Sequence, residues 1–348
     1  MAGQIHLPTA PSALSASAVL PVAAAERAPV NLSAFLVLGV LAIAVPLAAN
    51  TLWLKVATGV MIYSLTAMSI AVLYRRLGLV SLTHVALMGC GGWVVLRLAH
   101  GFDTPFEVNL LCGGLGAGLA GTALAWPALR MRGLYLALVT LMAAGAYAIL
   151  INVTQFPNGG DGWLGVAVRA VAFMPRPWIA LSDQAYFVYC CGIVALGYAL
   201  IGWHEATRAG RGWAMIRRSE AAAMSVGVNV TLYKVWGFAL SGFLAGIAGG
   251  LLAGDLQFLD ARSFPAAESV MIFALTIVGG AWHWYGALIA AALYRLAPAI
   301  LNNAGVDGNA AYIFFGLALI QALATAPKGI AGQIAGLLDR LARRGSQG

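Results

Sequence analysis

The 348-residue sequence contains few charged residues, since Asp, Glu, Lys and Arg make up 9% of it and hydrophobic residues 61%. Its mean hydropathy is +0.86, which excludes a soluble domain because so much apolar surface would aggregate in water. The sequence also lacks a G-x-x-x-x-G-K-[ST] phosphate loop, an H-E-x-x-H pair and any Cys/His cluster. These absences argue against an intramembrane enzyme, and they mean that any ATP must be hydrolysed by another protein.

Cysteine is also scarce: the four thiols lie in apolar runs without metal-ligand spacing, so we interpret them as packing residues. Basic residues outnumber acidic ones by 20 to 12, a net charge of +8. The basic residues are scattered through short segments between apolar runs, as orientation in a bilayer requires. This distribution excludes nucleic acid as a partner.

Long apolar runs dominate the remainder of the chain. Most contain about 20 residues, the length of helix that crosses a hydrocarbon core of about 30 Å. They predict an all-α, polytopic transmembrane bundle of about ten spans, and the short run ending at Gly279-Gly280 predicts a broken or re-entrant helix. The runs cover 32–50, 52–73, 78–98, 108–126, 133–153, 185–203, 236–254, 268–281, 285–301 and 309–326.

Charge counting orients these spans. Most of the Lys and Arg residues fall on one side if both termini are cytoplasmic, which places the long polar loop 204–235 in the cytoplasm. We therefore expect a disordered cytoplasmic tail at 1–31, a transmembrane domain at 32–326 and a basic cytoplasmic tail at 327–348. Most acidic residues, Glu268 among them, are expected to face outward.

The loop 204–235 has the pattern of a short helix at the membrane surface. Ser219 is placed to cap a helix whose first turn carries Glu220, three alanines follow at 221–223, and Gly227 ends the run. An exposed helix with an Ala-lined face and flanking arginines suits docking into a partner's cleft. The alternative is an ordinary solvated helix.

The run Ser219-Glu220-Ala221-Ala222-Ala223 with Gly227 resembles the "EAA…G" coupling loop of permease subunits of ATP-binding-cassette (ABC) importers. In that family the loop contacts the ATPase and passes nucleotide-driven motion to the membrane. The resemblance implies a coupling surface made of Arg217, Arg218, Ser219, Glu220, Ala221, Ala222 and Gly227.

Two further stretches are similar to branched-chain amino acid type permeases. Residues 130–141 followed by 158–165 resemble the family's "R-L-R-G-x-Y-F-A-L-x-T-L…T-G-G-x-x-G-L-x-G" pattern, and 78–93 resembles a small-residue segment of the same family with several departures, such as Thr83. Intramembrane polar groups and glycine-rich turns are candidates for a translocation path. The candidates are Ser81, His84, Tyr135, Thr140, Gly159, Gly160 and Asp161.

Structural explanations stay open for these candidates. Ser81 can bond to a backbone carbonyl, His84 can lie at the cytoplasmic interface, and the 158–165 stretch can be a plain glycine-rich turn. Arg295 falls inside a predicted span, where it can pair with an acid, snorkel to the interface or contact the solute.

The resemblance implies a non-catalytic permease in the inner membrane of a bacterial cell. Its expected partners are a second homologous permease, two ABC ATPases that carry ATP and Mg²⁺, an extracytoplasmic solute-binding protein and membrane lipid, with no cofactor or metal on this chain. The alternative is a stand-alone secondary transporter or channel, which requires acids within its spans. The solute, whether a branched-chain amino acid, urea, an amide or an aromatic acid, is not readable.

Overall fold

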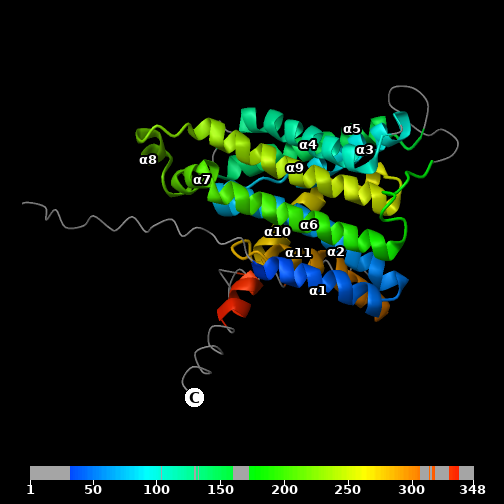
Figure 1. Ribbon diagram of the computed structural model, residues 1–348. Coiled ribbons are helices and arrows are strands. Elements are labelled where there is room, and N and C mark those ends of the chain that lie inside the picture. Colours follow the sequence, from blue (N-terminus) through cyan, green and yellow to red (C-terminus); the bar gives the residue numbers. More distant parts are fainter. Residues whose placement is uncertain are drawn as a thin grey trace, which may run out of the picture.

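The structure, a computed structural model, describes residues 32–102, 104–128, 131, 133–159, 172–305 and 329–336, with single positions at 313, 316 and 317. These parts of the chain are helical and contain no strand, which confirms the all-α prediction (Figure 1). The long helices run side by side, and two short ones, α7 and α8, lie together at one end of the bundle. We call this the α7–α8 end.

The helices alternate in direction between this end and the opposite one. The elements are α1 (Leu32–Ala48), α2 (Thr51–Val72), the π-helix η1 (Leu73–Leu77), α3 (His84–Gly101), α4 (Phe106–Ala128), α5 (Leu134–Thr154), α6 (Asp183–Ala206), α7 (Arg208–Arg218), α8 (Glu220–Ser225), α9 (Val230–Leu256), the 3₁₀ turn η2 (Ala261–Ser263), α10 (Ala266–Gly279) and α11 (Gly286–Asn303).

Six helical segments of the described chain are long and apolar enough to cross a membrane: Thr51–Leu77, Phe106–Trp126, Leu134–Thr154, Asp183–Ala206, Val230–Leu256 and Ala261–Gly279. Helix α1 is apolar but shorter. The runs predicted at 78–98 and 285–301 form helices α3 and α11, which are outside that set, and the run at 309–326 lies largely outside the described residues. The expected ten spans are therefore not confirmed, although the protein is a multi-pass bundle.

Glycines bring α3, α4 and α9 into backbone contact at the centre of the bundle. Gly249 of α9 lies against the Met88 carbonyl oxygen and the Gly92 amide of α3, and Gly91 lies against Gly246. A side chain at these positions would overlap backbone atoms of the neighbouring helix. Small residues allow this close approach, which compensates in lipid for the missing hydrophobic driving force between helices.

Charged groups tie the helices together at the end opposite α7 and α8. Lys55 Nζ lies 3.0 Å from Asp183 Oδ1 and 2.9 Å from Asp255 Oδ1. Arg176 Nη1 lies 2.8 Å from the same Asp183 oxygen, and its guanidinium sits 4.9 Å from the Tyr186 ring centroid. This network joins α2, α6 and α9 to the segment that precedes α6, so their ends are held in one arrangement.

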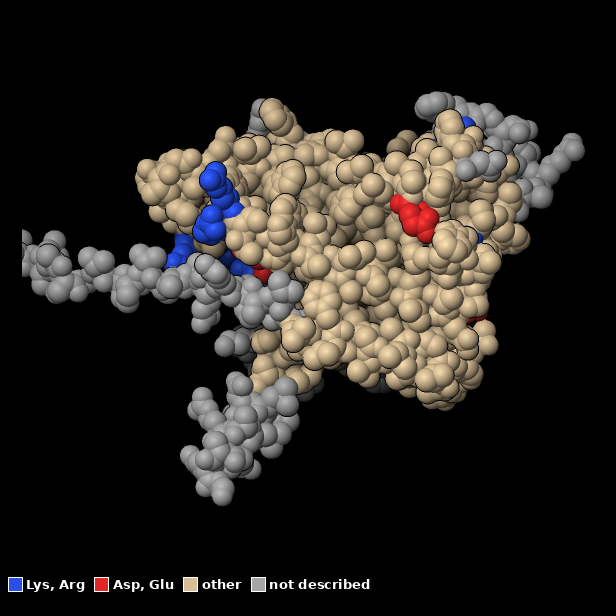
Figure 2. Space-filling view, in the orientation of Figure 1, with Lys and Arg blue, Asp and Glu red and all other residues tan. Residues whose placement is uncertain are grey.

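Other charges gather at the α7–α8 end. Figure 2 shows Lys and Arg side chains concentrated there, while most of the surface over the long helices carries no charge. An uncharged band with basic residues at one end is the distribution expected of a helical membrane protein.

Candidate functional site

The predicted coupling loop folds as two helices separated by Ser219. The Ser219 backbone is extended, with φ −161° and ψ 120°, and its hydroxyl oxygen accepts a hydrogen bond from the Ala222 amide at 3.2 Å. This is an N-cap, with Glu220 in the first turn as the sequence indicates. Lys234 of α9 donates to Glu220 Oε1 at 2.6 Å, so α8 is anchored to the start of the next long helix.

Helix α8 turns an apolar surface outward. Ala223 is fully buried, whereas Ala221 and Ala222 are exposed, Met224 is 58% exposed and Val226 is 62% exposed. We call these four exposed residues the α8 surface. Exposed apolar side chains gathered on a projecting helix make this surface a candidate interaction site.

Gly227 sets the direction of the chain after α8. Its φ is +82°, and a Cβ at this position would meet no heavy atom within 4 Å. The need for glycine is therefore conformational rather than steric, because side-chain-bearing residues rarely adopt this backbone conformation.

Helix α7 is fastened to the membrane bundle by two side chains. Trp213 is fully buried, and its Nε1 donates to the Tyr233 carbonyl at 2.9 Å. Arg217 Nη1 donates to the Tyr74 carbonyl at 2.6 Å, and its guanidinium lies 5.1 Å from the Trp282 ring centroid. Arg217 thus links α7 to η1 and to the turn between α10 and α11, while Arg218 is exposed.

A non-helical segment follows η1 and leads from the exposed Gly78 to buried positions inside the bundle. It begins at Gly78, whose φ is +70°, and continues to Thr83, with Ser81 and Thr83 buried. Buried backbone of this kind is tolerated at membrane depth only where other groups satisfy its hydrogen bonds. We call residues 78–83 the interrupted segment.

Hydroxyl groups from two distant helices supply those hydrogen bonds. Thr140 Oγ1 of α5 accepts from the Leu82 amide at 3.0 Å. Ser269 Oγ of α10 accepts from the Val85 amide at 3.2 Å. Ser81 Oγ lies 3.0 Å from Thr83 Oγ1. The interrupted segment is thereby tied to α5, and the first turn of α3 that follows it is tied to α10.

His84 begins α3 inside the bundle rather than at an interface, since it is only 1% exposed. Its Nε2 lies 2.8 Å from Ser241 Oγ, and Ser241 donates to the Ser69 carbonyl at 2.9 Å. Because a serine hydroxyl has one proton, Nε2 of His84 is the donor in this pair. The three residues join α2, α3 and α9 in one polar chain next to the interrupted segment.

The structure brings some of the candidate path residues together and separates others. Ser81, His84 and Thr140 all adjoin the interrupted segment. Tyr135 is 70% exposed in the first turn of α5, and Gly159, with φ +86°, lies at the opposite end of the bundle against Ala172. Gly160 and Asp161 lie outside the described residues, as do Arg130 and Arg132.

We predict that Thr140→Val impairs transport. The substitution keeps the side-chain shape but leaves the Leu82 amide without its acceptor inside the bundle, a loss of about 1–3 kcal/mol. Thr140→Ser restores the hydroxyl and serves as the control. Initial uptake rates in membrane vesicles should fall for the valine variant and stay near wild type for serine, and equal rates for both would show that this bond is dispensable.

Arg295 and Glu268 form an intramembrane polar group that sequence reasoning did not assemble. The Arg295 guanidinium lies 5.5 Å from the Tyr63 ring centroid, and Glu268 interacts with the Tyr294 hydroxyl and the charge of Arg295. Glu268 was expected to face outward, but it lies within α10, half-buried. The apolar run at 268–281 placed Glu268 at the very end of its predicted span. The helix in fact begins two residues earlier, at Ala266, so Glu268 belongs to its first turn.

Among the described residues, no group of three or more His, Cys, Asp or Glu side chains is placed to hold a metal ion. What the geometry defines is a multi-pass helical membrane protein with a broken segment inside its bundle and a helix pair projecting at one end. Such interrupted helices are typical of transporters.

Comparison with known proteins gives the family. The family model described as "Branched-chain amino acid transport system / permease component" matches residues 52–323, so the chain belongs to this family. It is similar to the high-affinity branched-chain amino acid transport system permease protein LivM of Salmonella typhimurium and of Escherichia coli. Each is 27% identical over 292 residues, covering 76% of this chain and 67% of the relative.

A weaker similarity is to the probable branched-chain amino acid transport permease protein LivH of Methanocaldococcus jannaschii, with 31% identity over 33% of this chain and 38% of that protein. No solved structure matches the chain significantly. Family membership makes this protein a permease subunit of an ABC importer, a transport subunit that works in a complex with other subunits and is not itself catalytic.

Proposed function

We propose that this permease imports branched-chain or related amino acids across the inner membrane of a bacterial cell, with the energy of ATP hydrolysed by two partner ATPases. A second homologous permease completes the membrane pathway, and an extracytoplasmic binding protein delivers the solute. The family match and the names of the relatives support the solute class. The basic α7–α8 end supports an orientation with that end and both termini in the cytoplasm.

The observation that carries this proposal is the exposed α8 surface on a helix pair fastened to the bundle. Docking requires that α8 be exposed, and transmission requires that it be held firmly to the spans. Capping by Ser219 and the ion pair between Glu220 and Lys234 make α8 a defined element. Arg217 connects the adjacent α7 to η1, and Trp213 connects it to α9.

The mechanism we propose is alternating access. ATP-driven closure of the ATPases displaces α7 and α8, and Arg217 passes the displacement to η1 and the interrupted segment. A single hydrogen bond ties that segment to α5 and another ties the first turn of α3 to α10, so a small shift of η1 changes how these helices meet. Ligands can shift such an equilibrium only through different contacts in the two states, and the ATPase contact at the α8 surface would supply that difference.

The test is purification of the tagged chain in mild detergent with its co-expressed partners, identification of the partners by mass spectrometry, and reconstitution in vesicles. We expect recovery of two ATPases and a sister permease, and uptake of labelled leucine only with ATP and the binding protein. Recovery of the chain alone, with ATP-independent uptake driven by an ion gradient, would instead establish the secondary transporter alternative, for which Glu268 is an acid within a span.

Gly227→Val is the variant predicted to uncouple this complex. A β-branched residue cannot adopt φ +82° without strain of about 1–3 kcal/mol, so α8 must reorient. ATP hydrolysis should persist while leucine uptake falls several-fold. Gly145→Val, on α5 where a Cβ meets nothing within 4 Å and the backbone is helical, is the matched control. Normal coupled uptake by Gly227→Val would remove the assigned role of α8.

A further inference from the structure

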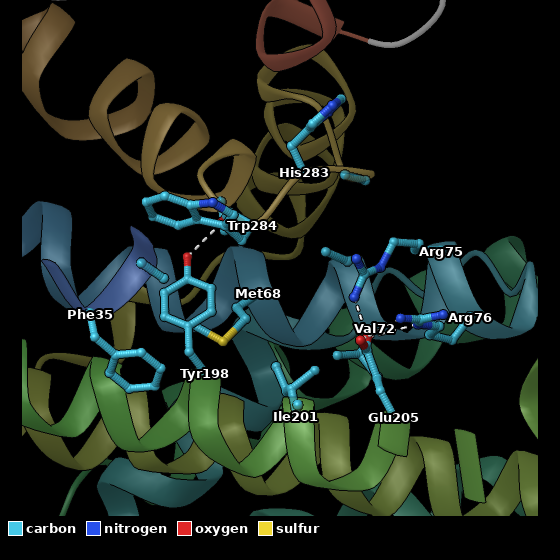
Figure 3. A pocket seen from close by; sticks show the side chains of 15 residues that line it. Phe35, Met68, Val72, Arg75, Arg76, Tyr198, Ile201, Glu205, His283 and Trp284 are labelled. Atoms are coloured by element: carbon cyan, nitrogen blue, oxygen red, sulfur yellow. Dashed lines mark hydrogen bonds and ion pairs between the residues drawn. The ribbon is translucent and has the colours of Figure 1, made fainter. Parts of the chain in front are cut away.

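A cavity of about 110 Å³ lies at the α7–α8 end between α1, α2, α6 and the turn before α11. Figure 3 shows its two halves: Arg75, Arg76 and Glu205 point toward one another on one side, and aromatic and aliphatic side chains line the other. The apolar half includes Phe35, Met68, Tyr198, Ile201 and Trp284. The cavity is therefore amphipathic.

The polar half has more positive than negative charge. Both guanidiniums pair with the single carboxylate of Glu205, with Arg76 Nε 2.7 Å from Glu205 Oε1. The remaining described residues that line the cavity include no other acid, so one positive charge is left over. The Arg75 Nε is buried and has no hydrogen-bond acceptor. A buried donor without an acceptor is costly, and an anion would satisfy both needs.

The apolar half places this cavity beside the bilayer. The outward face of α1 is exposed, with Leu36 63%, Val40 64% and Ile43 68% accessible, as expected of a helix that faces lipid. Phe35, on the same helix, lines the cavity. The Tyr198 hydroxyl donates to the Trp284 carbonyl at 2.7 Å, which fixes an aromatic pair of the kind enriched at membrane interfaces.

We propose that this cavity binds the phosphate group of an anionic phospholipid from the leaflet at the α7–α8 end. The phosphate would accept from Arg75 and Arg76, and an acyl chain would leave along the wall formed by Phe35 and Met68. Basic pockets between transmembrane helices at this depth suit such headgroups. The site goes beyond the proposed import of amino acids, and it rests only on the protein lying in a bilayer.

The occupant would also have a structural consequence. Arg75 and Arg76 belong to η1, and Arg217 contacts Tyr74 of the same element. A bound lipid would therefore stabilise the helix end to which α7 is fastened. Delipidated protein is expected to lose stability before it loses its secondary structure.

The experiment measures thermal unfolding of the delipidated complex, purified in detergent. Three additions are compared: mixed detergent micelles with phosphatidylglycerol, mixed detergent micelles with phosphatidylcholine, and inorganic phosphate. We expect a saturable rise of several degrees in the melting temperature with phosphatidylglycerol alone. Arg76→Gln should abolish most of that rise, because Arg75 and Glu205 then balance. Arg208→Gln, at an exposed arginine in the first turn of α7 at the same end, should keep it.

A second variant keeps the charges and blocks the apolar half. Ala71 lines the cavity, and Ala71→Leu would fill space that the acyl chain needs. We expect native mass spectrometry to show phosphatidylglycerol retained by wild type and lost in this variant. An equal response to phosphatidylcholine, or an unchanged response in Arg76→Gln, would overturn the site. Saturation by inorganic phosphate alone would show a free-anion site and overturn the lipid assignment.

Discussion

Replacing Gly249 with alanine is expected to prevent stable packing of α3 on α9. The added Cβ would overlap the Met88 carbonyl oxygen and lie 2.9 Å from the Gly92 nitrogen, both backbone atoms that cannot rotate away. The helices must separate, and the backbone contact between Gly91 and Gly246 opens with them. Overpacking of this kind costs on the order of 3 kcal/mol, so the purified protein should melt at a clearly lower temperature.

The matched control is Gly192→Ala. Gly192 lies on α6, where a new Cβ meets no heavy atom within 4 Å. Alanine is favoured over glycine in a helix by roughly 0.5–1 kcal/mol, so this variant should melt at or slightly above the wild-type temperature. If Gly249→Ala melted together with Gly192→Ala, the backbone contact between α3 and α9 would not exist in the protein.

Arg217→Ala is expected to separate ATP hydrolysis from solute uptake. The substitution removes the hydrogen bond to the Tyr74 carbonyl and the stacking on Trp282, which join α7 to the membrane bundle. Hydrogen bonds to charged groups are worth about 1.5–3 kcal/mol, enough to lower the fraction of productive cycles about tenfold. Uptake per ATP hydrolysed in reconstituted vesicles is the quantity to measure, and the complex should remain assembled.

Arg218→Ala distinguishes transmission from docking. Arg218 is exposed beside α8, so its loss should weaken ATPase binding in a salt-dependent way and leave uptake per ATP unchanged. Arg217→Lys retains the charge without the planar guanidinium and should only partly restore coupling. Equal behaviour of the two alanine variants would refute the division of roles between these neighbouring arginines.

Much of the local structure was readable from local patterns. The apolar runs predicted helices because a chain in lipid must satisfy its backbone hydrogen bonds internally. Ser219 followed by Glu220 predicted a helix start, and the structure places a cap there. The predicted permease family is confirmed by the family match over residues 52–323. The roles of the coupling residues stay predictions.

Other features could not be read from local patterns. Glu268 was assigned outward by its position near a loop, yet it lies in α10 beside Arg295 and Tyr294. Arg217 and Arg218 are adjacent in sequence and alike in chemistry, and only the rotation of α7 turns one toward Tyr74 and leaves the other exposed. Sequence spacing does not specify such rotations, because they follow from packing against distant helices.

The sequence by itself determined that this is an all-helical membrane protein, since composition, run length and capping depend on neighbouring residues only, and its motifs carried the resemblance to the permease family. The tertiary structure decided which groups meet. Thr140 reaches the Leu82 amide, Ser241 reaches His84, and Arg75 and Arg76 share Glu205 across separations of 58 to 157 residues. These contacts depend on the tilt, depth and rotation of several helices packed at once, and the close approach of α3, α4 and α9 through glycine sets those quantities.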